Sequence, residues 1–288
     1  MKKLWMLSLL LLLCSGCSGT NRFQPSIKPS PIITSNIRQQ AADTTSPVPT
    51  NHTPDLASGK ELDVRTPNAL TLTDLRQKYR TYFIFNGPAD KRQVALSFDD
   101  GPDDIYTPKI LDVLNKYGVK ATFFLIGNRA EAYPELVKRI AKEGHVIANH
   151  SYNHPNLPKI TDAEFQDQVL RTVNILHQLV GYVPKLFRPP YGNINSEQIE
   201  WMASQQLFVV NWNVDSLDWK NLNADQVYAN IMGDVQPGSI ILQHSAGGTG
   251  EDLSGTVEAL PRIIEKLQAD GVKLVTIPEL LGMTSTNK

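Results

Sequence analysis

The chain is poor in cysteine: two of its 288 residues are cysteines, and both lie before residue 18. The rest of the chain therefore has no disulfide of its own. Its folded part must be stabilised by its core, as a domain of more than about 200 residues can be. Positive charge is not in excess either, with 28 Lys and Arg against 29 Asp and Glu. Because nucleic-acid-binding proteins usually carry such an excess, we expect no nucleic-acid partner.

A long hydrophobic run is also lacking near the N-terminus. The apolar stretch from Leu4 to Leu13 covers ten positions, which is too short to span a bilayer comfortably. Two lysines precede this stretch, and the small residues Ser15 and Gly16 follow it. This order is typical of an export signal. We therefore expect residues 1–16 to be a signal peptide.

Cys17 comes directly after these small residues, and the segment resembles the lipobox of bacterial lipoproteins, in which such a cysteine carries the lipid. Cys14 stands where the lipobox usually has Leu. A redox or zinc pair formed by Cys14 and Cys17 is disfavoured, because no second ligand pair accompanies it. We expect a protein outside the cytoplasm that is anchored to the bacterial cell membrane through lipid on Cys17. Plain secretion is the alternative.

The rest of the chain divides into three parts by composition. Residues 17–64 are rich in Ser, Thr, Pro, Asn and Gln, with few aromatic residues and no lasting apolar period. This composition predicts a disordered tether, with a root-mean-square reach of about 35–40 Å. Residues 65–93 then suggest an accessory helix and strand. Residues 94–283 suggest one large domain.

Short apolar strands alternate with amphipathic helices through this domain. We expect strands at 94–98, 121–126, 146–149, 186–187, 208–212, 240–243 and 273–277, and helices at 108–117, 131–143, 162–180 and 257–269. About seven βα units favour an α/β barrel, complete or incomplete, over an open sheet. Polar clusters follow five of the segments expected to be strands. In a βα barrel this position is where the active site is built.

Two of these clusters together offer ligands for a metal. Asp99 and Asp100 precede Gly101-Pro102, and His150 and His154 lie four residues apart. One carboxylate and two imidazoles make a site that keeps coordination positions open for water or substrate. The second carboxylate can take a proton from the attacking water. The alternatives are an Asx-type turn for the aspartates and surface positions for the histidines.

Three further clusters could complete a reactive site. Arg188 stands in Arg188-Pro-Pro-Tyr-Gly192, where two prolines fix the loop, so it can orient a carboxylate or form a structural ion pair. His244 follows a strand, and an Asp such as Asp215 could raise its pKa. Leu242 and Trp219 could wall a small apolar pocket.

In this order the five clusters resemble the five motifs of the polysaccharide deacetylases of carbohydrate esterase family 4, the NodB-homology group. The resemblance covers roughly residues 94–281 and makes 94–283 the catalytic domain. It implies a distorted (β/α)7 barrel of the TIM-like kind. It also implies that Asp100, His150 and His154 bind a divalent metal, usually zinc and sometimes cobalt or nickel.

The resemblance assigns roles to the remaining residues as well. It makes Asp99 the general base, Arg188 its partner, and His244 the general acid, which we expect Asp215 to tune. It implies that the backbone N–H of Tyr191 stabilises the oxyanion. By the same resemblance, Leu242 and Trp219 line the pocket for the acetyl methyl group.

The reaction implied is metal-dependent removal of N-acetyl groups from N-acetylglucosamine-type residues of a polysaccharide. Membrane anchoring favours a cell-envelope substrate, peptidoglycan or chitin-like oligomers, and we expect a monomer. Three alternatives stay open: an O-acetyl esterase on the same fold, a sugar-binding lipoprotein that has lost catalysis, and a non-haem iron oxygenase. The oxygenase has no need of a spare Asp base or a His acid.

Overall fold

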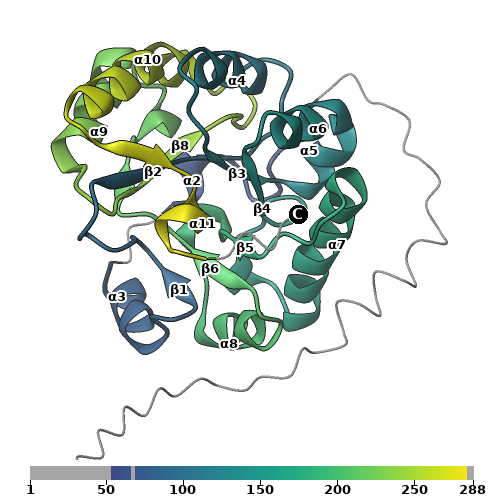
Figure 1. The fold of residues 1–288 in the computed structure, drawn as a ribbon. Helices are drawn as coiled ribbons and strands as arrows, with labels where there is room; N and C mark the ends of the chain where they lie inside the picture. The colour runs from purple at the N-terminus through teal and green to yellow at the C-terminus, as the bar shows by residue number, and fades with distance from the viewer. Residues whose placement is uncertain (1–52, 66–68, 284–288) are drawn as a thin grey trace, which may run out of the picture.

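Strands and helices alternate along most of the chain and build one curled sheet (Figure 1). The computed structural model describes residues 53–65 and 69–283. The expected signal peptide, Cys17 and the tether as far as residue 52 lie outside the described residues. No helix within the described ranges is both long enough and apolar enough to cross a membrane.

All the strands pair in parallel, as repeated βα units require. Their order is β1-β6-β5-β4-β3-β2-β8-β7, and β9 pairs with β2. An antiparallel bridge between Asn86 and Ser239 links the end of β1 to the start of β8. The sheet therefore curls into the expected distorted (β/α)7 barrel. The strands are β1 (Phe83–Ile84), β2 (Gln93–Asp99), β3 (Thr122–Leu125), β4 (Val146–Asn149), β5 (Leu186–Phe187), β6 (Phe208–Val210), β7 (Val214–Asp215), β8 (Ile240–His244) and β9 (Lys273–Val275).

The longer helices surround the strands in Figure 1. Helix α7 shows why the ends fall where they do: Thr161 forms a capping box with Glu164 at its start, and Gly181, with φ 83°, ends it. The helices are α2 (Glu61–Val64), α3 (Ala69–Lys78), α4 (Thr107–Lys116), α5 (Gly127–Ala132), α6 (Pro134–Lys142), α7 (Asp162–Val180), α8 (Ser196–Ser204), α9 (Ala224–Asp234), α10 (Ser254–Ala269) and α11 (Ile277–Leu280).

The two faces of the sheet carry different side chains, because successive residues of a strand point to opposite sides. In β2, Leu96 and Phe98 pack into the large apolar cluster that the outer helices cover. Ala95 belongs to a separate cluster inside the barrel. Ser97 and Asp99 share the side of Ala95, so the polar end of β2 faces the interior. By the same alternation, Leu242 and His244 share the inner side of Ile240 in β8.

The boundary expected for the tether is wrong at its C-terminal end. Residues 53–64, which the composition placed in the tether, lie on the barrel together with Arg65 and include α2. We call residues 53–65 the N-terminal strap. Hydrogen bonds to distant loops hold the strap, and an apolar period is not what fixes it, so composition could not reveal it. Strand β1, expected as an accessory element, pairs with β6 and is part of the sheet.

Candidate active site

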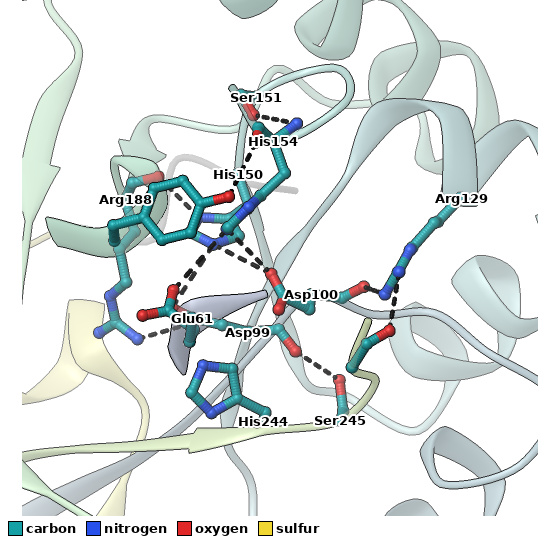
Figure 2. Close-up of polar contacts among 12 residues, drawn as sticks. Glu61, Asp99, Asp100, Arg129, His150, Ser151, His154, Arg188, His244 and Ser245 are labelled. Carbon is teal, nitrogen blue, oxygen red and sulfur yellow. Dashed lines mark hydrogen bonds and ion pairs between the residues drawn. The ribbon is translucent and has the colours of Figure 1, made fainter. Parts of the chain in front are cut away.

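The polar groups gather at the carboxyl ends of the strands, where parallel strands meet at one edge. Figure 2 shows Asp99 from the end of β2, His150 after β4, Arg188 after β5 and His244 at the end of β8 pointing toward one another. The β2–β8 register sets Asp99 directly beside His244. The sheet therefore brings together residues that are up to 145 positions apart in sequence (244 − 99).

Asp100, His150 and His154 form a compact triad of ligand atoms that lie within 4.8 Å of one another. Asp100 Oδ1 is 3.3 Å from Nε2 of each histidine. With zinc–ligand bonds of about 2.0 Å, the corners of a tetrahedron are about 3.3 Å apart, so the spacing fits a metal of this kind. Asp100 Oδ1 and His154 Nε2 are buried and have no hydrogen-bond partner, as expected of atoms that serve as ligands.

Backbone conformation explains how two neighbouring aspartates reach one site. Asp100 has φ 67° and His154 has φ 64°, in the left-handed region that residues with a Cβ seldom adopt. The turn at Asp100 brings back to the site a side chain that would otherwise point to the outer face. Strain of this kind is typical of functional residues.

The protonation of the triad suits metal binding. His150 Nδ1–H donates to the carbonyl of Arg188 at 2.7 Å, which directs Nε2 at the triad. Burial alone would lower the pKa of His150, but the Asp99 and Asp100 carboxylates raise it, so a metal would displace the Nε2 proton. Burial lowers the pKa of His154 to about 3, so this imidazole is neutral. Burial alone would raise the pKa of Asp100, but the two imidazoles outweigh it and hold the pKa well below its ordinary value.

Asp99 is held by a buried arginine and not by the triad. Arg188 Nη1 donates to Asp99 Oδ1 at 2.7 Å and to Ser97 Oγ at 2.9 Å. The same guanidinium donates to the carbonyls of Val210 and Asn211 at 3.0 and 3.2 Å. Its orientation is therefore fixed, and one oxygen of Asp99 is engaged. The other oxygen, 3.7 Å from His150 Nε2, faces the site.

His244 is paired with Asp218, not with Asp215 as expected. Its Nδ1–H donates to Asp218 Oδ1 at 2.7 Å. The other oxygen of Asp218 accepts from Thr256 Oγ1 at 2.6 Å and from the His244 N–H at 2.8 Å. Burial alone would lower the pKa of His244, but the Asp218 carboxylate raises it well above the ordinary value. His244 is therefore held as an acid.

Asp215 has hydrogen-bond partners other than His244. Its side chain accepts from Arg65 Nη2 at 2.6 Å, from the Leu217 N–H at 2.9 Å and from Trp219 Nε1 at 3.4 Å. Leu217 has φ 56° and starts a short 3-10 helix, which turns Asp218 toward His244. This left-handed turn is what the sequence did not reveal, although Asp218 stands in the same motif.

The residues expected around an acyl group also lie at this end of the barrel. Tyr191, with φ 60°, places its ring edge-on to His154, with ring centroids 4.5 Å apart. Leu242 is buried on β8 and is paired in register with Ser97 and Asp215. Trp219 is almost buried. These positions are compatible with the expected roles, which remain predictions.

Three residues at the site were not expected from the sequence. Arg129 is buried and donates to the carbonyls of Asp100, Gly247 and Pro54, each at 2.9 Å, and thereby supports the turn at Asp100. Glu61 and Arg65 enter from the strap. Burial raises the pKa of Glu61 to about 7, although the Arg65 guanidinium opposes this shift. No local signal in the tether composition marks these two residues as part of a site.

Comparisons with known proteins agree with this geometry. Residues 86–210 match the polysaccharide deacetylase family. The chain is 49% identical over 206 residues to a peptidoglycan-N-acetylglucosamine deacetylase of Bacillus cereus, covering 72% of this chain and 74% of the relative. It is 39% identical to the Bacillus subtilis peptidoglycan-N-acetylmuramic acid deacetylase PdaC, covering 66% of this chain but only 39% of that longer relative.

A solved structure extends the likeness to three dimensions. The structure matches the crystal structure of the Bc1960 peptidoglycan N-acetylglucosamine deacetylase with a TM-score of 0.69. The match covers 71% of this chain and 95% of that one, and the two sequences are 48% identical. Both the sheet and the sequence of the catalytic domain are therefore shared with enzymes of known class. The chain belongs to the polysaccharide deacetylase family, the metal-dependent enzymes of carbohydrate esterase family 4.

Proposed function

We propose that this protein is a metal-dependent hydrolase that removes N-acetyl groups from N-acetylglucosamine residues of peptidoglycan. The observation that carries the proposal is the placement of two opposed groups beside one metal triad. Asp99 keeps one oxygen toward the site, and His244 is paired so that it stays protonated. Hydrolysis of an amide needs a base for the water and an acid for the departing nitrogen.

The triad of Asp100, His150 and His154 would hold the metal, and we propose zinc because one carboxylate and two imidazoles suit it. Cobalt and nickel accept the same ligands. When bound, such a metal supplies Lewis-acid activation of the acetamide carbonyl and of the attacking water. The buried, unpartnered ligand atoms of Asp100 and His154 support this assignment.

The chain's own residues would then move the protons. Asp99 takes a proton from the attacking water on its free oxygen, while Arg188 holds the other oxygen and keeps the carboxylate oriented. His244 gives its proton to the nitrogen as the C–N bond breaks, yielding a free amine and acetate. Asp218 stabilises the imidazolium before the transfer.

The same acid favours an amide over an ester substrate. An amine leaves poorly unless it is protonated, whereas an alcohol from an O-acetyl group needs less help. A histidine whose pKa is raised by a buried carboxylate is therefore better suited to N-deacetylation. We assign Tyr191 N–H to the oxyanion and Leu242 with Trp219 to the acetyl methyl group. The edge-on ring contact of Tyr191 with His154 and the pairing of Leu242 with Asp215 support this assignment.

Similarity to named relatives supports the proposed substrate, and the N-terminal sequence supports the proposed cellular location. Relatives named for peptidoglycan support that polymer, and the higher identity to the N-acetylglucosamine enzyme favours that sugar over N-acetylmuramic acid. The signal pattern and Cys17 support lipid anchoring outside the cytoplasm. Replacement of Cys17 by Ser should move the protein from the membrane fraction into the medium. Retention in the membrane would contradict the anchor.

The function is tested by acetate release. Zinc-loaded protein should release acetate from purified peptidoglycan and, at a lower rate, from chitin oligomers, with free amines appearing in equal amount. Asp225→Asn, at an exposed position on α9, is a matched control for charge removal and should retain full activity. Absence of acetate from every N-acetylated glycan tested would reject the proposal.

A further inference from the structure

The N-terminal strap lies across the carboxyl end of the barrel, with contacts to several loops that surround the site. Arg129 Nε donates to the Pro54 carbonyl at 2.9 Å, and the Ala57 N–H donates to the Asn153 carbonyl at 2.8 Å. Tyr191 Oη donates to the Gly59 carbonyl at 2.7 Å. Arg129 lies in α5, which follows β3, and Asn153 and Tyr191 lie in the connections after β4 and β5. In Figure 1, α2 projects onto the middle of the ring of strands, in agreement with these contacts.

One helical turn of the strap directs two side chains at the site, because residues four apart lie on the same face. Figure 2 shows the Glu61 carboxylate facing the same space as Asp99, Asp100 and the histidines. Its Oε1 is 4.0 Å from His154 Nε2. Its Oε2 is buried without a hydrogen-bond partner. This carboxylate therefore lies beside the triad, close to His154.

Arg65 lies against two tryptophan rings next to the site. Its guanidinium lies 4.7 Å from the ring centroid of Trp212 and 5.1 Å from that of Trp219. It also forms the ion pair with Asp215 at 2.6 Å. The side chain therefore fills space beside the aromatic wall that the proposed function assigns to the acetyl methyl group.

With the strap in place the reactive groups are sealed. The exposed fractions are 2% for Asp99, 1% for Asp100, 2% for His150, 0% for His154 and 3% for His244. Groups buried to this extent offer little surface to a sugar residue of a polymer. Displacement of the strap would open a way to them.

The strap is built to be displaced without unfolding the barrel. Leu56 is its only buried apolar side chain, and Leu62 is 59% exposed. Most of its attachment consists of hydrogen bonds, which exchange for bonds to water at a small net cost. Segments with few buried apolar contacts are the ones that open locally.

We propose that the strap is a built-in plug in which Glu61 is a fourth protein ligand for the metal and Arg65 covers the acetyl pocket. The polysaccharide must displace both to bind. A carboxylate is an ordinary zinc ligand. The 4.0 Å separation from His154 Nε2 exceeds a tetrahedral edge by about 0.7 Å. Glu61 lies outside the group of ligand atoms that are within 4.8 Å of one another, so ligation requires its side chain to rotate toward the triad. This inference rests on the proposed function for the identity of the displacing substrate.

The first test is metal affinity, measured by competition with a chromophoric chelator on the full chain. Glu61→Gln should weaken zinc binding about tenfold or more. Asp63→Asn removes a charge from the exposed side of the same helix and should leave the affinity unchanged. Equal affinities for the wild type and both variants would overturn the ligand assignment. This readout does not depend on any activity.

The second test follows displacement. Binding of a chitin oligomer to Asp99→Asn protein should speed hydrogen exchange of residues 53–65, including the amide of Ala57. Glu61→Gln should lower KM severalfold, because substrate then competes with a weaker plug. A raised KM, or exchange that slows on binding, would overturn the plug and make the strap part of the substrate site. Acetate release by the wild type separately decides whether the proposed function holds.

Discussion

His244 and the carboxylate of Asp218 are joined twice, through the ring Nδ1–H to Oδ1 at 2.7 Å and through the backbone N–H to Oδ2 at 2.8 Å. One aspartate thus fixes both the ring and the strand end that carries it. Thr256 binds the same carboxylate from α10 at 2.6 Å. The geometry holds Nε2 of the imidazole toward the site as a proton donor.

Asp218→Asn should therefore lower kcat about 10²-fold or more, the typical contribution of a positioned acid. Without the carboxylate, burial dominates and lowers the pKa of His244. The acid then loses its proton at lower pH, so the alkaline limb of the kcat/KM profile moves to lower pH. Asp215→Asn should leave that limb in place. A limb that moves in Asp215→Asn and not in Asp218→Asn would reverse the assignment.

The same pair should also make stability depend on pH. The pKa of His244 is raised from its ordinary 6.5. Its contribution to the free energy of unfolding is therefore full below pH 6.5 and is lost as the pH rises through the pKa of the folded state. The pKa of Asp218 is lowered from 3.8, so its contribution is present above 3.8 and is lost on acidification. The loss of unfolding free energy in Asp218→Asn should be largest between these values. Urea denaturation from pH 3 to pH 9 would measure it.

Arg188→Met should destabilise the fold by about 3–5 kcal/mol, the typical cost of removing one partner of a buried ion pair. It leaves the buried Asp99 carboxylate unpaired, and the carbonyl of Val210 loses its donor. Arg262→Met is the matched control, because its pair with Asp225 is 48% and 84% exposed. That change should cost less than about 1 kcal/mol. Similar losses in both variants would contradict the buried network.

Much of this site follows from sequence because strand ends and side-chain alternation can be anticipated. The strand expected at 94–98 is β2, and the strand expected at 240–243 is β8; each carries a reactive residue at its carboxyl end. Long amphipathic helices such as α7 fall within the expected bounds. The triad follows from the same alternation and the left-handed turn at Asp100.

The rest depended on contacts that have no local signal. His244 pairs with Asp218 and not with the expected Asp215, because a left-handed turn at Leu217 directs Asp218 toward it. The strap is held by hydrogen bonds to residues as distant as Tyr191. Helices α8 and α9 were not expected, because each buries only a few apolar side chains, such as Ile199 in α8 and Val227 in α9.

Metal binding should stabilise the fold through the residues of the triad. Zinc at about 1,000 times its Kd should add about 4 kcal/mol to the free energy of unfolding. A chelator should remove this increment. His154→Ala removes one ligand and should show no increment at the same zinc concentration. A zinc-dependent rise in Tm that persists in this variant would place the metal elsewhere.

The separate roles of the neighbouring aspartates are the centre of the account, and Asp99→Asn tests them most directly. The variant should still bind about one metal ion per chain, because Asp100 and the histidines are untouched. Its acetate release should fall at least about 10³-fold, within the range expected for loss of a general base. Full metal content with no detectable acetate is the predicted result. Acetate release equal to that of the wild type would contradict Asp99 as the base.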